Sequence, residues 1–223
     1  MLDKLVNSKH YAMLEHGTIY LYVDGGLPVD TFKLSYMFKK YYENPYSRVK
    51  WNPGDPYLTV TTNYRVIKEH GWEDDLRYLC EPTGNHIKRY TLRIVTSIGI
   101  VRELLRHRVF SFANESTRYV NYGKQGEIYF IKPYWYDLSS DPTKSNLDDL
   151  CRLAEISYNE LLDKKLPPQA AREVLPLCTK SELVMTGFED DWDRFLELRL
   201  EGVTGKPHPD MLQLASMIKS SLH

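Results

Sequence analysis

The sequence predicts an α+β fold, a single domain in which an antiparallel or mixed sheet is flanked by helices. Its 223 residues are enough for one domain with a substantial core and too few for two large domains. β-Branched and aromatic runs typical of strands alternate with segments whose apolar residues recur at helical spacing. We find no internal repeat and no low-complexity segment, so we expect residues 1–223 to form one domain.

The first third of the chain predicts a strand, two helical regions and a long loop. Residues 18–23 are β-branched and aromatic and run into a glycine turn, which is typical of a strand. Asp30 can cap a helix that begins at the next residue. Three prolines and a glycine within residues 44–57 indicate a loop that leaves the core. We expect helix again within residues 63–79, ended by the Glu-Pro-Thr-Gly stretch that follows.

The middle of the chain predicts a strand followed by an amphipathic helix. Residues 90–95 have the composition of a strand. Apolar residues then recur at helical spacing within residues 96–108, with Arg102 and Arg106 one turn apart. Residues 109–118 are polar, and we expect a loop there. Residues 127–132 resemble another strand.

The last third predicts four helices. A long helix is indicated by the apolar face that recurs within residues 147–162. The proline pair at 167–168 can start a short helix, because proline is tolerated at the first helical position, and Pro176 stops it. Asp190 or Asp191 can cap a helix that continues to Leu200. A final amphipathic helix is expected over residues 209–219.

Composition excludes several classes of protein. The formal net charge is -1, so there is no overall basic field to hold a nucleic acid, and any anion must bind at a local cluster. The three cysteines are widely separated and lack metal-site spacing, which indicates free thiols and no metal site. The N-terminus is too polar for a signal peptide, and no later run approaches transmembrane length. We therefore expect a cytoplasmic protein that binds neither membrane nor nucleic acid.

One short segment concentrates the chemically useful side chains. Arginines are permanently charged, and their planar fork matches phosphate and carboxylate oxygens. Several of them beside hydroxyl and amide donors would form an anion pocket, whereas the alternative is a solvated helix end with cations near the C-terminal dipole. A phosphohistidine phosphatase is disfavoured, because its Arg-His-Gly motif follows a first strand. The residues are Arg102, Arg106, His107, Arg108, Asn114, Ser116 and Arg118.

This segment resembles the signature of the flavin-dependent thymidylate synthases. Arg106-His107-Arg108 followed by seven residues and Ser116 is the RHR-x7-S motif of that family. Residues 10–16 (HYAMLEH) resemble its early HxxxxEH box, residues 170–177 (AAREVLPL) its ARxxLP box, and residues 195–199 (FLELR) its FLxLR box. Residues 24–89 look like an insertion between matching segments.

The resemblance implies a set of site residues. Arg199 would be catalytic, stabilising negative charge on the pyrimidine. Departures from the family pattern occur at Ala12, Glu103, Asp190 and Arg194. The dUMP contacts implied are Glu103, Arg106, Ser116, Arg118, Arg172 and Arg199, and the FAD contacts implied are His10, Arg106, His107, Arg108, Asn114 and Arg194.

The activity implied is reductive methylation of dUMP to dTMP. Methylenetetrahydrofolate would donate the carbon and NADPH would reduce the FAD. The sequence has no GxGxxG after a strand, so a Rossmann fold does not hold the FAD. None of the three cysteines lies beside a recognisable base, which argues against a cysteine nucleophile. The resemblance also implies a homotetramer whose active sites are shared between subunits.

Two other functions remain open at this point. A non-catalytic nucleotide- or RNA-binding module could use the same arginines, with Phe112, Tyr119 and Tyr122 as stacking platforms. Such a module would be colourless. A flavoprotein reductase without methyl transfer would be yellow and oxidise NADPH, but it would not respond to dUMP.

Overall fold

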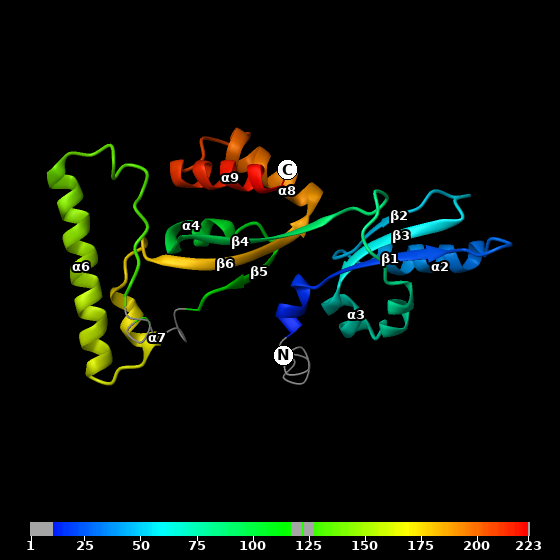
Figure 1. The fold of residues 1–223 in the computed structure, drawn as a ribbon, viewed down its shortest axis with the longest axis horizontal. Coiled ribbons are helices and arrows are strands. Elements are labelled where there is room, and N and C mark those ends of the chain that lie inside the picture. Colours follow the sequence, from blue (N-terminus) through cyan, green and yellow to red (C-terminus); the bar gives the residue numbers. More distant parts are fainter. Residues whose placement is uncertain (1–10, 117–121, 123–126, 223) are drawn as a thin grey trace. The chain divides into compact units, whose positions relative to one another are not determined.

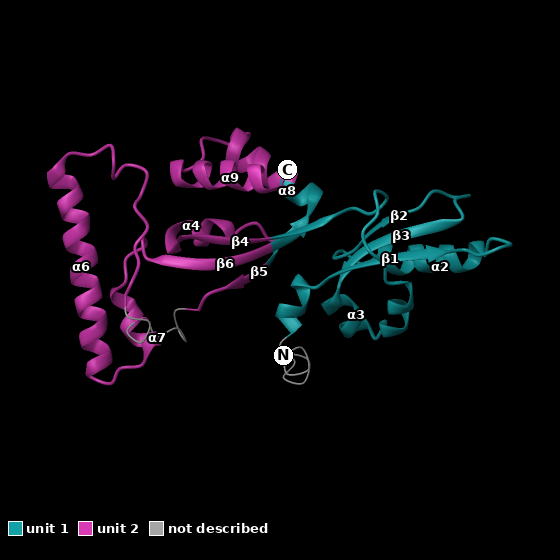
Figure 2. Cartoon of the chain, in the orientation of Figure 1, with its two compact units in different colours: residues 1–91, 109–111, 186–192 teal, residues 92–108, 112–185, 193–223 magenta. Residues whose placement is uncertain are grey.

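The computed structural model describes residues 11–116, 122 and 127–222. Two compact units are present (Figure 2): residues 1–91, 109–111 and 186–192 in one, which we call unit 1, and the rest in the other, unit 2. Two of the predicted site residues, His10 and Arg118, lie outside the described residues, as does Tyr119. This division does not test whether residues 1–223 form a single catalytic domain with an insertion at 24–89, which stays a prediction.

Unit 1 contains a three-stranded antiparallel sheet in the order β1-β3-β2 (Figure 1). The predicted strand is confirmed as β1, Thr18–Asp24. The loop predicted over residues 44–57 is partly wrong, because β2, Arg48–Lys50, lies within it, and β3, Tyr57–Asn63, was missed. The prolines and the glycine near these strands indicate a loop, which is why the strands were not predicted. The three threonines of β3 are a contrary signal, because threonine is a good strand former.

One helix of unit 1 lies between β1 and β2 in the chain, and another follows β3. The capping prediction is confirmed in α2, Thr31–Tyr42, where the Asp30 carboxylate accepts the Lys33 N–H at 2.9 Å. Its apolar face packs with β1 and β3 in the core of unit 1. The helical region predicted over residues 63–79 is interrupted: α3, Tyr64–His70, ends where Gly71 takes a left-handed conformation, and a 3-10 helix, η2, Glu73–Tyr78, follows. A further 3-10 helix, η1, Tyr11–His16, precedes β1.

A second three-stranded sheet has the order β4-β6-β5 (Figure 1). The predicted strand at residues 90–95 is confirmed as β4, Arg89–Ser97. The loop predicted over 109–118 contains β5, Ser111–Asn114, and β6, Lys180–Phe188, was missed. The strand predicted over residues 127–132 is wrong, since only an isolated bridge joins Phe130 to Thr179.

The remaining helices agree with prediction in place and differ in length, but the predicted cap at Asp190 or Asp191 is wrong, because both residues lie inside a helix that begins at Glu189. α4, Ile98–Leu104, is shorter than the predicted 96–108, so Arg106 is not one helical turn from Arg102. The last predicted helix extends to α9, Pro209–Leu222. None of the helices in the described ranges is both long enough and apolar enough to cross a lipid bilayer. The others are α6, Asp141–Asp163; α7, Pro168–Ala171; the 3-10 helix η3, Arg172–Val174; α8, Glu189–Leu196; and the π-helical turn η4, Glu197–Glu201.

The α+β class is confirmed, with two small antiparallel sheets flanked by helices. In unit 2, Leu104 of α4 and Met211 and Ala215 of α9 are fully buried. A separate apolar cluster joins α6 to the chain around it through Tyr158 and Ala171. The buried helices α4 and α9 lie at the two ends of residues 98–222, the segment that carries the candidate site.

Candidate active site

The residue predicted to be catalytic lies in an unusual helical turn. Arg199 is in η4, where the chain changes from α-helical to π-helical after α8. Gly202 closes this turn in a left-handed conformation, with φ of 71°, and its N–H donates to the Glu197 carbonyl. π-Helical turns are rare and occur frequently at functional sites.

The Arg199 guanidinium contacts Glu103 of α4 and His107 in the turn that follows this helix. Its Nε donates to Nε2 of His107 at 2.8 Å, and its Nη1 lies 3.3 Å from Oε2 of Glu103. All three residues belong to unit 2. The structure therefore brings together three of the residues predicted from sequence, and we call them the Arg199 cluster.

His107 is neutral in this cluster. Burial, followed by the positive charge of Arg199, lowers the pKa of His107 to about 4. A guanidinium can only donate hydrogen bonds, so Nε2 must accept and the ring proton must lie on Nδ1. The edge of the ring also packs against Phe195 of α8, with ring centroids 5.0 Å apart. His107 thus holds Arg199 in place without adding charge.

Two cavities adjoin the cluster. The first has a volume of about 390 Å³ and the second of about 640 Å³. Glu103 and His208 line both of them. The smaller cavity is lined by Glu103, His107, Leu198, Arg199 and residues 204–208.

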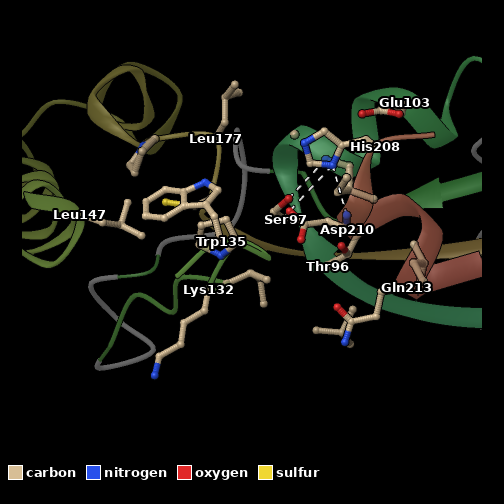
Figure 3. Close-up of a pocket in the computed structure, with 18 of the residues that line it drawn as sticks. Thr96, Ser97, Glu103, Lys132, Trp135, Leu147, Leu177, His208, Asp210 and Gln213 are labelled. Atoms are coloured by element: carbon tan, nitrogen blue, oxygen red, sulfur yellow. Dashed lines mark hydrogen bonds and ion pairs between the residues drawn. The ribbon is translucent and has the colours of Figure 1, made fainter. Parts of the chain in front are cut away.

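The larger cavity has an aromatic wall and a polar wall. Figure 3 shows Trp135 and Leu147 on one side and His208 and Asp210 on the other. The Asp210 carboxylate accepts the Tyr134 N–H at 2.7 Å, which fixes its position. None of these four residues was predicted from the sequence to line the site. The Gly-Lys-Pro-His-Pro run after Arg199 is a loop signal that could have indicated the shared wall around His208.

The two arginines that flank His107 are exposed, unlike the histidine itself. Arg106 and Arg108 lie in the turn after α4. Within the part of the chain that the structure describes, neither guanidinium makes a hydrogen bond or an ion pair. Two permanent positive charges are therefore available to an anionic ligand.

The other predicted residues lie on different elements. Asn114 is at the end of β5 and accepts from the Ser181 hydroxyl at 3.2 Å, and Ser116 is half-buried just after it. Arg172 is in η3, with its Nε 3.7 Å from Glu173. Arg194 is 61% exposed and pairs with Glu197 at 2.6 Å. The binding roles of all of these residues stay predictions.

No group of three or more His, Cys, Asp or Glu side chains that could hold a metal ion occurs within the described ranges. The structure therefore offers no observation that favours a metal centre there.

A protein-family model matches the part of the chain that contains the site. The model of the family described as thymidylate synthase complementing protein matches residues 85–221, which is more than half of the chain. The match includes the Arg199 cluster and begins after most of the predicted insertion. The box at residues 10–16 lies outside it.

Individual relatives are similar over part of their length. A probable flavin-dependent thymidylate synthase of Paramecium bursaria Chlorella virus 1 is 30% identical over 132 residues, covering 54% of this chain and 61% of the relative. A flavin-dependent thymidylate synthase of Corynebacterium efficiens is 37% identical over 139 residues, covering 56% of each. The chain thus spans less than two thirds of the length of these relatives.

A solved structure is also similar. It is described as a UMP/dUMP methylase, PolB, from Streptomyces cacaoi bound with 5-Br dUMP, and it aligns with a TM-score of 0.48 at 26% identity. The alignment covers 60% of this chain and 65% of that one.

Proposed function

Since this chain belongs to the thymidylate synthase complementing protein family, we propose that it is a flavin-dependent thymidylate synthase. Its reaction is the reductive methylation of dUMP to dTMP. Methylenetetrahydrofolate supplies the carbon, and NADPH supplies the reducing equivalents through FAD. The two relatives described above are named as a probable and a flavin-dependent thymidylate synthase, which supports the proposal.

The observation that carries the proposal is the convergence of Arg199 with His107 and Glu103 beside one cavity. Carbon 5 of uracil becomes nucleophilic when negative charge develops on the N3/O4 edge of the ring. A fixed guanidinium beside that edge stabilises the charge without having to reorganise. Because His107 is neutral, it orients Arg199 without offsetting its positive charge, which only Glu103 of the cluster does.

The residues present fit FAD as the cofactor. A dinucleotide carries two phosphates, and Arg106 and Arg108 are exposed without an anionic partner among the described residues. His107 lies between these arginines in the sequence, and its pKa keeps it neutral at pH 7. When bound, FAD supplies the redox chemistry, and the protein supplies position and field. We assign to the same set His10, Asn114 and Arg194.

The rest of the dUMP site is assigned from the family motifs. Ser116, Arg118 and Arg172 would hold the phosphate and sugar, Arg199 would contact the base, and Glu103 and Arg106 would be further dUMP contacts. In this proposal dUMP, the folate and NADPH are the partners, and four chains share their active sites. The protein acts in the cytoplasm, which cell fractionation can check.

The test is an assay of the purified protein. Oxidised-flavin absorbance should be present after FAD is added and the excess removed, and dTMP should form only when dUMP, methylenetetrahydrofolate and NADPH are all supplied. The same sample should sediment with the mass of four chains. A colourless protein that binds RNA would refute the proposal, and so would NADPH oxidation that ignores dUMP and yields no dTMP.

A further inference from the structure

Two cysteines that are distant in sequence lie side by side in unit 2. The Sγ atoms of Cys151 and Cys178 are 3.7 Å apart, which is contact distance for two thiols. Both are free and partly exposed. The sulfur of the third cysteine, Cys80, lies instead near the Tyr20 carbonyl at 3.6 Å and His86 at 3.8 Å. Cys151 and Cys178 therefore form a thiol pair, and Cys80 serves as an internal control for a cysteine that has no thiol neighbour.

Both members of the pair lie on firmly held backbone. Cys151 is in the long helix α6, and the next turns of that helix are buried through Ala154 and Tyr158. The Cys178 carbonyl accepts the Ile131 N–H at 2.7 Å, and the following residue, Thr179, is fully buried. The close approach is thus a property of the packed unit. A disulfide needs an S–S distance of about 2.05 Å, so the sulfurs have to close by roughly 1.7 Å through side-chain rotation.

A small oxidant can reach the pair through the larger cavity. Cys178 lines that cavity of about 640 Å³, and so does Leu147, one turn before Cys151 on α6. A cavity of this size admits a small peptide disulfide at least in part. Cys178 is therefore the sulfur that an incoming oxidant meets first.

We propose that Cys151 and Cys178 form a reversible intramolecular disulfide that ties α6 to the start of β6 when the protein meets a low-molecular-weight disulfide such as oxidised glutathione. The Cys178 thiolate attacks one glutathione sulfur, a mixed disulfide forms, and one glutathione leaves as a thiol. The Cys151 thiolate then attacks the Cys178 sulfur and releases the second glutathione. The protein loses two electrons and two protons, and the oxidant is reduced to two thiols.

The second step is the slow one. Burial is the main cause that raises the pKa of Cys151, and it persists once Cys178 is in the mixed disulfide, so the Cys151 thiolate is rare at neutral pH. The mixed disulfide on Cys178 should therefore accumulate before the ring closes.

The test is incubation of the full-length protein with oxidised glutathione, followed by quenching, unfolding and thiol titration. Reactive thiols should fall from three to one, and mass spectrometry should find a peptide that links Cys151 to Cys178. Reduced glutathione should restore all three thiols. The Cys80→Ser variant should form the same link, whereas Cys151→Ser should stop at a glutathione adduct on Cys178.

Three outcomes would overturn the inference. They are persistence of three free thiols in the wild type, glutathione adducts that never resolve into the internal link, and a disulfide that joins two chains or involves Cys80. Melting of the oxidised wild type provides a second readout. Its Tm should exceed that of the reduced protein, and Cys151→Ser should show no such rise.

Discussion

Arg199 is oriented by a side chain that carries no charge of its own. Its partner His107 accepts a hydrogen bond at 2.8 Å, and a pKa of about 4 leaves the ring uncharged at pH 7. Glu103 already offsets part of the charge of Arg199, because its carboxylate lies 3.3 Å from the guanidinium. A second carboxylate in the place of His107 would have offset more of it. The geometry thus favours an arginine that can stabilise negative charge on a ligand.

The pKa of His107 should rise when this charge is removed. Arg199→Gln keeps an N–H donor near Nε2 but abolishes the charge, so the pKa of His107 should move upward from about 4 while remaining below its usual value, because burial persists. Imidazole NMR titration measures this, with His107→Ala to assign the signal. An unchanged pKa in Arg199→Gln would show that the two side chains are not in contact.

The lowered pKa of His107 also makes the free energy of unfolding depend on pH. A histidine whose pKa is lowered in the folded state contributes stability above the unfolded pKa of about 6.5, and that contribution is lost as the pH falls toward 4. The free energy of unfolding should therefore decline more steeply over this range in the wild type than in Arg199→Gln.

The residue types of the site could be predicted from the sequence, but their environments could not. The Arg-His-Arg motif identifies residues 106–108 as a unit. The fold then separates them, since His107 is partly buried against Phe195 while Arg106 and Arg108 are exposed. That separation depends on the packing of a helix that lies far away in the chain.

At the scale of elements, the helices were easier to predict than the strands. Capping at Asp30 and the helical periodicity of α6 and α9 are local signals, and each was confirmed. The helix α4 ends at Leu104 because the buried positions stop there, and Leu105 is 40% exposed. β6 was not predicted, because it is stabilised by pairing with β4 and β5, which are distant in the sequence. In the structure, burial alternates along its first residues.

The turn that carries Arg199 depends on a glycine. Gly202 has φ of +71°, and a Cβ there would lie 3.1 Å from the Gly205 oxygen and from Pro207. Gly202→Ala should cost about 1–2 kcal/mol for the left-handed backbone and an additional ~1 kcal/mol for crowding. It should also disturb the hydrogen bond to His107. Denaturant unfolding and the titration of His107 measure the two effects.

Gly71 supplies the matched control. It closes α3 with φ of +66°, but a Cβ there meets nothing within 4 Å. Gly71→Ala should therefore show the backbone cost alone and leave the titration of His107 unchanged. Equal stability losses in the two variants, with no effect on His107, would contradict the role given to Gly202.

At the scale of the whole molecule, the family match and the compact units divide the chain differently. The match covers residues 85–221, whereas unit 1 includes residues 11–84 with a sheet and core of its own. The predicted insertion at 24–89 falls in this unit, and its role stays a prediction. The proposed chemistry resides in unit 2, where the Arg199 cluster and both adjoining cavities lie.

The most direct test of the central claim is dTMP formation by Arg199→Ala after loading with FAD. Loss of a preorganised charge should reduce turnover on the order of a hundredfold to a thousandfold. Flavin absorbance should be retained, and Arg172→Ala should likewise lose dTMP formation. The control is Arg152→Ala, which removes an exposed arginine of α6 paired with Asp149 and should turn over like the wild type. Wild-type turnover in flavin-loaded Arg199→Ala would contradict the account.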